Sequence, residues 1–486
     1  MADRRVVLSA PRTASPDALR QAFAQIRQRL AVPVEFPAEV LAEAERAAAA
    51  GPQGPPPQDA TEVPFVTIDP PGSLDLDQAM HLERSSGGGY RVRYAIADVP
   101  AFVVPEGAID AEARRRGETV YLPDGSEPLH PRRLSEGAAS LLPGQVRPAF
   151  VWDLRLDADG RLTAAAVTRA MVRSVARLDY VGVQADLDAG RAPELIRLLA
   201  EVGERRIAQE AARGGASLPK PEQEVVSTAD GYELRFRPPV PIEDWNAQIS
   251  LLTGMAAADL MLAGGVGILR TMPAPDSGSV DRFRRQAGAL GVPWPQDQPY
   301  GQFLRDLNRD DPHHLALMHA ATALFRGAGY TPFDGAPPQQ REHAALAAPY
   351  AHVTAPLRRL VDRFGLALCA ALSADLDVPD WVRAALPSLP DIMKVSGRLT
   401  GAVERACTDA VEAAVLAPLV GHVWEATVVE TRGDKGCTVQ VADPAVLAEC
   451  AQPARPGARV RVRLAGTDVA AQRSVFELVA GGDDAG

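Results

Sequence analysis

Three aspartates close together in the sequence could bind a divalent cation. Residues 65–69 are typical of a strand that ends at Asp69, and a Pro-Pro-Gly turn follows it. An extended pattern resumes over residues 74–82, so Asp75 and Asp77 should share one face of that strand. Three converging carboxylates repel one another unless a cation lies between them, and oxygen ligands favour Mg²⁺ or Mn²⁺ over zinc. Taken alone, the same residues are equally compatible with a polar turn of solvated carboxylates.

The sequence around these aspartates resembles the catalytic signature of the ribonuclease II family. Residues 67–79 read TIDPPGSLDLDQA, where the family has T-I-D-x-x-x-x-x-D-x-D-D-A, and residues 95–99 read AIADV like a second family element. Later blocks resemble the family in its own order, at 118–123, 128–136, 140–143, 350–363 and 404–412. The resemblance extends over roughly residues 35–482. It implies an α+β multidomain fold with a central RNB catalytic domain.

The resemblance also implies a metal-dependent exoribonuclease. Such an enzyme degrades single-stranded RNA processively from the 3′ end and releases nucleoside 5′-monophosphates in RNA turnover. Two Mg²⁺ ions can together supply the nucleophilic hydroxide, neutralise charge on the phosphorus and stabilise the leaving oxygen. Asp69, Asp75 and Asp77 are the expected ligands of Mg²⁺, or of Mn²⁺ in its place. Asp77 matches the family position most closely tied to turnover, and Asp75 is expected to share the catalytic role.

One position departs from the family motif. Gln78 occupies the place of the last aspartate. We expect its carbonyl oxygen to act as a fourth metal ligand, which requires a local bend, and we expect metal affinity to fall because one negative charge is lost. The same residue supports a rival hypothesis, in which the chain is a catalytically lapsed RNB scaffold that acts as an RNA-binding regulator.

A pair of arginines is expected near the carboxylates. Residues 354–356 read Thr-Ala-Pro and predict a helix start, which would place Arg358 in the first turn beside free backbone amides that can hold a phosphate. The resemblance makes Arg358 the catalytic arginine. Arg359 should point about 100° away around the helix and form a structural ion pair.

RNA contacts are expected from side chains that do not read sequence. Aromatic faces bind successive bases of a single strand by stacking. The resemblance makes Tyr121 and Tyr180 such contacts and places Glu404 near the terminal nucleotide, whereas no binding residue is transferred to residues 246–255. For each tyrosine the alternative is a half-buried structural role.

The last part of the chain predicts a small barrel. Short alternating strands separated by Gly, Pro and Asp turns follow residue 421, and in this position they resemble the C-terminal OB-fold RNA-binding domain of the family. Arg459, Arg461 and Arg463 should lie on one face of a strand and contact RNA. The alternative is a solvated face of the barrel.

The predicted organisation has several parts. Amphipathic spacing predicts a helix that starts near Ser15 and a second helix that follows Pro37. The first of these belongs to a module too short for a cold-shock domain, in which a helix-turn-helix is one option. The predicted parts are a small helical N-terminal module over 1–34, a helix and Pro/Gly-rich linker over 35–60, the RNB domain over 61–416 and the OB-fold over 417–482.

Composition limits the class of protein. The chain has 486 residues, 46% of them hydrophobic and 23% charged, and it shows neither a run of about 18 apolar residues nor a signal peptide. We therefore expect a cytoplasmic protein with no membrane partner. Its four cysteines have no metal-ligand spacing, its histidines form no credible cluster, and no Gly-rich nucleotide loop indicates a nucleotide cofactor. We expect a monomer whose partner is single-stranded RNA.

The net charge of −11 does not by itself favour a nucleic-acid partner. Local clusters of arginine could line a channel while acidic residues cover the outside. The alternative for each cluster is a solvated patch. The clusters are Arg114 to Arg116, Arg132 and Arg133, Arg284 and Arg285, and Arg358 and Arg359.

Overall fold

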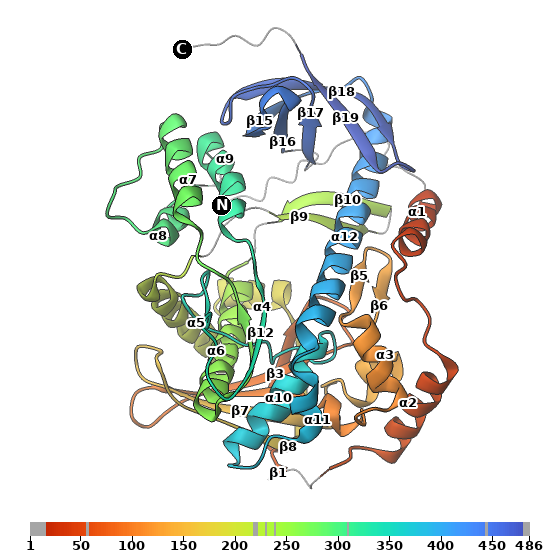
Figure 1. Ribbon diagram of the computed structural model, residues 1–486, viewed down its shortest axis with the longest axis vertical. Coiled ribbons are helices and arrows are strands. Elements are labelled where there is room, and N and C mark those ends of the chain that lie inside the picture. The colour runs from red at the N-terminus through yellow and green to blue at the C-terminus, as the bar shows by residue number, and fades with distance from the viewer. Residues whose placement is uncertain are drawn as a thin grey trace.

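The computed structural model describes residues 16–54, 58–216, 222–228, 231–237, 240–308, 311–442 and 446–479. An α+β body forms the lower part of the molecule, and a small β-barrel lies above it (Figure 1). The long helix α12 (Leu389–Leu416) runs from the body to the barrel. The expected fold class is therefore confirmed.

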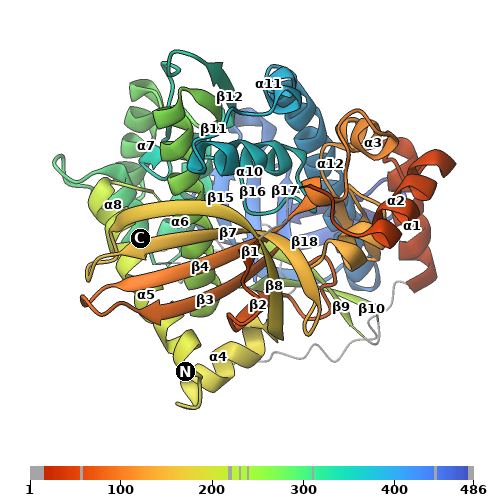
Figure 2. The ribbon, with the colours of Figure 1, turned by 90° about the horizontal axis from the view of Figure 1, so that it is seen from below.

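A six-stranded sheet forms the floor of the body (Figure 2). Its strand order is β1-β8-β2-β3-β4-β7, and β8 also pairs with β7. The strand β8 can pair with both β7 and β2 because it is long: its first part pairs with β7, and its last part runs parallel to β2. The strands are β1 (Gln58–Asp59), β2 (Phe65–Asp69), β3 (Gln78–Arg84), β4 (Tyr90–Ala97), β7 (Val146–Leu156) and β8 (Leu162–Asp179).

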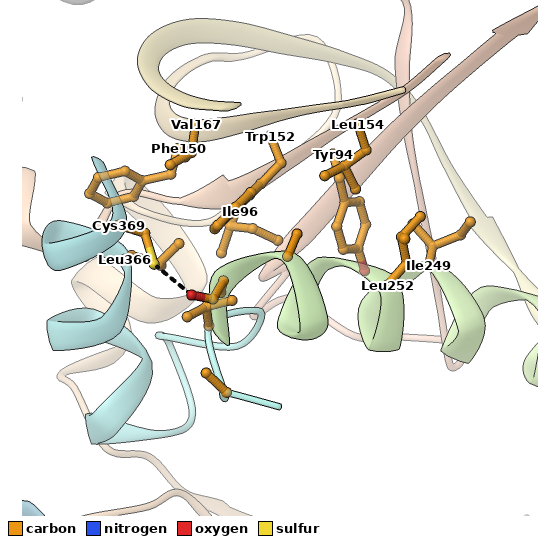
Figure 3. Close-up of a cluster of buried hydrophobic side chains, with 14 of the residues drawn as sticks. Tyr94, Ile96, Phe150, Trp152, Leu154, Val167, Ile249, Leu252, Leu366 and Cys369 are labelled. Atoms are coloured by element: carbon orange, nitrogen blue, oxygen red, sulfur yellow. Dashed lines mark hydrogen bonds between the residues drawn. The ribbon is translucent and has the colours of Figure 1, made fainter. Parts of the chain in front are cut away.

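Helices cover one face of this sheet and form the main core. Tyr94 projects from β4 toward Ile249 and Leu252 of α6, and Trp152 of β7 lies in the same cluster beside Ile96 (Figure 3). Leu366 of α10 lies in the same cluster. The helices of this layer are α4 (Tyr180–Asp188), α5 (Glu194–Arg213), α6 (Pro241–Gly264) and α10 (Leu360–Ser373).

Helix α6 is unusually apolar for this chain. It is the one described helix long and apolar enough to cross a bilayer, with a mean hydropathy of 1.3 over its most apolar window. More than half of that window is buried inside the molecule, where α6 packs against α5 and α10. Its apolar character is accounted for by its place in the protein core.

The two N-terminal helices form where the sequence predicted them. Helix α1 (Pro16–Arg29) packs against α12, and α2 (Ala38–Ala50) packs against α3 (Ala108–Arg116). The segment between α1 and α2 is held by Arg116, which donates hydrogen bonds to the carbonyls of Pro33 and Glu35. Residues 1–15 of the expected N-terminal module lie outside the described residues, and the domain boundaries at 34, 60 and 416 stay predictions.

The C-terminal strands close into the expected barrel, in the order β15-β16-β17-β19-β18. Its inner side chains form one cluster with α1 and α12, so the barrel and these helices share a core. The strands are β15 (Val423–Thr431), β16 (Cys437–Val441), β17 (Val446–Cys450), β18 (Arg459–Asp468) and β19 (Arg473–Leu478).

Smaller elements complete the body and link it to the barrel. Helix α9 packs against β15, and the ring of His319 forms a hydrogen bond with Gln440. The remaining helices are α7 (Ser277–Ala289), α8 (Tyr300–Arg305), α9 (Pro312–Ala321) and α11 (Asp380–Ala385). The remaining strands pair two by two: β5 (Val120–Leu122) with β6 (Gly125–Glu127), β9 (Glu222–Thr228) with β10 (Gly231–Arg237), β11 (Val266–Thr271) with β12 (Gly329–Asp334), and β13 (Glu342–His343) with β14 (Ala348–Pro349).

Candidate active site

Asp77 lies at the centre of the candidate site. Its carboxylate is 5% exposed. One oxygen, Oδ1, accepts a hydrogen bond of 2.7 Å from the backbone N–H of Leu357, and Oδ2 lies 3.5 Å from Nε of Arg358. Burial raises the pKa of Asp77 well above its usual value, while the charge of Arg358 and the Leu357 hydrogen bond oppose that rise. The predicted proximity of Asp77 and Arg358 is present.

The local backbone differs from the prediction. Strand β3 begins at Gln78, so Asp75 and Asp77 precede the strand instead of lying within it. The irregular segment from Pro70 to Asp77 is held from outside, because the hydroxyl of Ser140 accepts from the N–H of Leu76 and donates to the carbonyl of Leu74. The expected two-residue alternation therefore does not decide where these aspartates point.

Asp69 has the chemistry of a cation ligand. It is the last residue of β2 and pairs in register with Asp179 of β8. Its Oδ2 is buried and has no hydrogen-bond partner. Burial and the charge of Asp75 raise the pKa of Asp69 to about 6, and Arg358 and Arg177 act in the opposite direction. A buried carboxylate oxygen without a donor is costly, and a bound cation would remove that cost.

These carboxylates do not form a closed cage. Over the described ranges, no three His, Cys, Asp or Glu side chains are close enough together to hold a metal. The fit to Mg²⁺ or Mn²⁺ therefore rests on the unpaired oxygen of Asp69 and on a donor set made only of oxygens. Asp69, Asp75 and Asp77 would have to come closer together than they lie here to hold one ion, so their role as ligands stays a prediction.

Tyr121 reaches the site from β5. Its hydroxyl donates a 3.0 Å hydrogen bond to Oδ2 of Asp75. The residue is 51% exposed, so much of its ring remains accessible. Burial of the hydroxyl, and then the negative charge of Asp75, raise the pKa of Tyr121. The predicted stacking tyrosine thus lies directly beside a predicted metal ligand.

Tyr180 lies near Asp69, whose β8 partner Asp179 directly precedes it in the chain. It is the first residue of α4, directly after the N-cap Asp179, and its hydroxyl accepts a 3.0 Å hydrogen bond from Nδ2 of Asn246. Burial and the charge of Asp69 raise the pKa of Tyr180 to about 12. Asn246 belongs to the block from which no functional residue was predicted, so the sequence missed this partner.

The predicted helix around Arg358 is wrong. Helix α10 begins at Leu360 and has Arg359 as its N-cap, so Arg358 lies in the turn before the helix. Pro356 and the hydrogen bond from Leu357 to Asp77 keep this segment out of the helix. The side chain of Arg358 is 44% exposed and can reach a ligand. The free amides of a helix N-terminus were expected to help Arg358 bind a phosphate. In the structure the N–H of Leu357, in this turn, already donates its hydrogen bond to Asp77.

Arg359 has the predicted structural role. It forms a 2.9 Å ion pair with Asp362, which is fully buried. The second contact of the same Asp362 oxygen comes from the N–H of Ala355, so the pair fixes both ends of the turn that carries Arg358.

Gln78 is engaged within the protein. Its Nε2 donates a 2.6 Å hydrogen bond to the carbonyl of Thr354, and its Oε1 accepts from the hydroxyl of Tyr94. The hydroxyl of Ser250 forms a 2.8 Å hydrogen bond with that of Tyr94. The carbonyl oxygen that was expected to bind a metal thus accepts a hydrogen bond from the hydroxyl of Tyr94. Its role as a ligand stays a prediction.

The remaining predicted RNA contacts lie away from this group. Glu404 is exposed on α12, and no contact of it with the carboxylates is seen among the described residues. Arg459, Arg461 and Arg463 are exposed on β18, while Val462 and Leu464 on the other face are buried and Val460 is half-buried, in agreement with the predicted alternation. Arg463 forms a 2.8 Å ion pair with Glu477.

Most arginines of the predicted clusters have partners within the protein, and whether any of them line a channel stays a prediction. Arg116 is buried against Phe36 and pairs with Glu112, and Arg114 pairs with Asp110. The others that pair locally are Arg115 with Glu112, Arg132 with Glu136, Arg133 with Glu45, and Arg284 with the ring of Trp294. Acidic neighbours one helical turn away were a usable sign of this in the sequence.

One exposed cation was missed. Arg177 lies near the end of β8, where its charge acts on Asp69, and its Nη1 donates a 3.0 Å hydrogen bond to the carbonyl of Ser73. The alternation of Arg173, Val175 and Arg177 before Tyr180 was the available signal, since these side chains share the exposed face of the strand.

Comparison with known proteins agrees with this geometry. Residues 57–368 match the RNB domain, and residues 422–479 match the RNase II-type exonuclease C-terminal S1 domain. Ribonuclease R of Escherichia coli is 31% identical over 324 residues, which cover 63% of this chain and 39% of that protein. The matched part is thus well under half of that relative's length.

Solved structures share the fold. RNase R of Mycoplasma genitalium, in complex with ribose-methylated single-stranded RNA, gives a TM-score of 0.85 at 19% identity and covers 95% of this chain and 78% of its own. Yeast Ssd1, described as a pseudonuclease, gives 0.66 at 17% identity, over 85% of this chain and 52% of its own. The fold alone therefore does not decide whether a protein is catalytic, whereas the RNB match over most of the chain shows its ancestry: this protein belongs to the RNB-domain exoribonuclease family, of the ribonuclease II and ribonuclease R type, with a C-terminal S1 domain.

Proposed function

We propose that this protein is a divalent-metal-dependent exoribonuclease that removes nucleoside 5′-monophosphates from the 3′ end of single-stranded RNA. The observation that carries the proposal is the carboxylate group of Asp69, Asp75 and Asp77, in which a buried oxygen of Asp69 has no partner. Direction, product and Mg²⁺ or Mn²⁺ as the metal follow from membership of the family and are part of the proposal.

The carboxylates would hold the metal. When bound, the metal supplies an activated water and neutralises charge on the phosphate. Asp77 is fixed by the Leu357 amide on one oxygen, so its other oxygen keeps a defined direction. Asp69 brings a second carboxylate from the end of β2, and its raised pKa favours a bound cation over a free carboxylate.

Arg358 would bind the scissile phosphate. Its Nε lies beside Asp77, and 44% of the side chain is exposed, so its guanidinium can donate hydrogen bonds to two phosphate oxygens. Positive charge at this point acts most strongly on the charge that develops in the transition state. The buried pair of Arg359 and Asp362 holds the turn in place while this occurs.

Two tyrosines would position the last nucleotides. Tyr121 and Tyr180 approach the carboxylates from β5 and α4, and each has its hydroxyl anchored by a hydrogen bond. An anchored ring can stack on a base of any identity, which suits an enzyme that advances along RNA without reading its sequence. Glu404 would contact the terminal nucleotide, and the exposed arginines of β18 would bind RNA further from the site.

A second candidate function is an RNA-binding regulator without catalysis. Gln78 favours it, because the site has one carboxylate fewer than the family motif and the amide is bonded to Thr354 and Tyr94. The fold likeness to a protein described as a pseudonuclease is compatible with this alternative.

One experiment separates the two functions. Oligoribonucleotides labelled uniformly or only at the 5′ end are incubated with the protein in Mg²⁺ or in EDTA. The enzyme should release labelled mononucleotides from the first substrate, shorten the second stepwise and stop in EDTA. Tight RNA binding with no product, in Mg²⁺ or in EDTA, would support the regulator. A single internal cut would contradict exonucleolytic action.

A further inference from the structure

Gln78 is the residue at which this chain leaves its family, and its surroundings explain the departure. Both ends of its amide are used inside the protein, by the carbonyl of Thr354 and the hydroxyl of Tyr94. A carboxylate has no hydrogen to donate to the Thr354 carbonyl, so an ionised aspartate could not replace this bond. The amide is therefore matched to its neighbours.

The bond to Thr354 lies at the start of a functional turn. Three residues beyond Thr354, the N–H of Leu357 binds Asp77, and the next residue is Arg358. Gln78 itself directly follows Asp77 in the chain. The segment 77–78 thus contacts the segment 354–357 at both ends, through Asp77 with Leu357 and through Gln78 with Thr354.

The far side of Gln78 is also fixed. Tyr94 is fully buried on β4, and its hydroxyl donates to Gln78 and meets the hydroxyl of Ser250 on α6. Gln78 lies opposite Ile96 in the β3–β4 register, so its backbone belongs to the sheet. The network therefore connects the sheet, α6 and the turn of Arg358 through one side chain.

We propose that Gln78 is a positioning residue, not a metal ligand, and that its amide holds the 354–358 turn so that the Leu357 amide and Arg358 meet Asp77. This inference rests on the proposed function and specifies one residue of that site. It reverses the expectation from the sequence that a carboxylate at position 78 would restore a better metal site.

The main test replaces the amide and keeps its size. Gln78→Met removes the donor to Thr354 and the acceptor for Tyr94. Gln248→Met is the matched control, since Gln248 is a more deeply buried glutamine of α6 that donates to Glu210, away from Asp69, Asp75 and Asp77. Each variant is compared with wild type by hydrogen exchange of residues 354–358 and by the Kd for Mn²⁺, measured by electron paramagnetic resonance. The kcat and the Kd for RNA are measured as well, so that an effect on turnover can be told from an effect on RNA binding.

Gln78→Met should expose the Leu357 amide to faster exchange and leave the Kd for Mn²⁺ unchanged. It should lower kcat by about 10- to 100-fold, because small displacements of positioned groups cost that much, while RNA affinity changes little. The control should show none of these effects. A weaker Kd for Mn²⁺ with unchanged exchange of 354–358 would overturn the proposal, because it would make Gln78 a ligand.

Two further variants keep the test decisive. Tyr94→Phe removes only the hydroxyl bonded to Gln78, so it should show the same pattern more weakly if Gln78→Met fails to fold. Gln78→Asp should lower the rate without moving the Mg²⁺ midpoint downward, and a lower midpoint with a higher rate would contradict the proposal. Exchange and Mn²⁺ binding do not require turnover, so they decide the role of Gln78 even if the wild type hydrolyses no RNA and the proposed function fails.

Discussion

The carboxylate site and the arginine face of the barrel hold their charges in different ways. At the site, Asp77 is buried and bonded to Leu357, and Arg359 is locked to a fully buried Asp362. On β18 the arginines are exposed, and the ion pair of Arg463 with Glu477 is itself exposed. Buried charges act strongly over short distances, whereas exposed charges are screened by salt. We therefore expect the first region to act in catalysis and the second in RNA binding.

The largest difference between the two regions should be seen when the carboxylate of Asp77 is removed. Asp77→Asn should reduce turnover by about 10³-fold or more, because it removes the charge at the predicted metal and phosphate position. RNA affinity should stay near that of wild type, since stacking and barrel contacts do not involve this group. Turnover and equilibrium binding are measured on one poly(A) oligomer.

Asp98→Asn is a suitable control for that variant. Asp98 is also a buried aspartate, but it pairs with Arg169 and caps a short helix, so its loss should lower the melting temperature while kcat survives. Mononucleotide release by Asp77→Asn at the wild-type rate would remove Asp77 from catalysis.

Substitutions of the neighbouring Arg358 and Arg359 should have different effects, the first on catalysis and the second on folding stability. Arg358→Ala should lower kcat by about 10²-fold with little loss of RNA affinity, because its charge acts on the transition state. Arg359→Ala leaves Asp362 buried without its partner and should cost about 3 kcal/mol of folding free energy. Kinetics and thermal unfolding of both variants check this, and equal kinetic defects with unchanged melting would show that the two roles are assigned wrongly.

The buried carboxylates also predict a pH dependence of metal binding. Because the pKa of Asp69 is raised to about 6, Mg²⁺ must displace a proton below that pH, and its affinity should fall about tenfold for each further unit of pH. Asp69→Asn should remove this part of the dependence. Calorimetric titrations on either side of pH 6 measure it, and an affinity that does not change with pH would contradict the assignment.

The same shift affects the metal-free protein with a defined sign. The pKa of Asp69 in the folded state lies above its ordinary value of 3.8, so folding takes up a proton between these values. The stabilising contribution of Asp69 is therefore complete below about 3.8 and is lost as the pH rises through about 6. Unfolding in EDTA at several pH values measures it, with Asp69→Asn as the control.

The smallest effect is expected on the barrel. Replacing Arg459, Arg461 and Arg463 together by alanine should weaken binding of long RNA about tenfold and lower the slope of log affinity against log salt by about 2. Cleavage of very short oligomers should persist. Arg383→Ala removes an exposed arginine that pairs with Asp334 and serves as the control.

This triple variant is a better test than removal of the barrel. The inner side of the barrel shares a core with α1 and α12, so ending the chain near Pro418 would expose that core. An unchanged salt slope in the triple variant would show that these arginines do not contact RNA.

The sequence by itself determined what depends on residue type and local spacing. The motif of residues 67–79 predicted the family, alternation placed Arg459, Arg461 and Arg463 outside the barrel, and Ser15 and Pro37 marked the first helices. These features follow from periodicity and capping, which act over a few residues.

Only the tertiary structure decided how the site is assembled. Asp77 and Leu357 are far apart in the chain, and their hydrogen bond keeps Arg358 outside α10, although local sequence favoured a helix there. In the same way Thr354, Tyr94 and Ser250 determine what the amide of Gln78 does. The physical reason is that a buried polar group takes the partner that the fold brings within reach, and that partner comes from elements with no fixed separation in sequence.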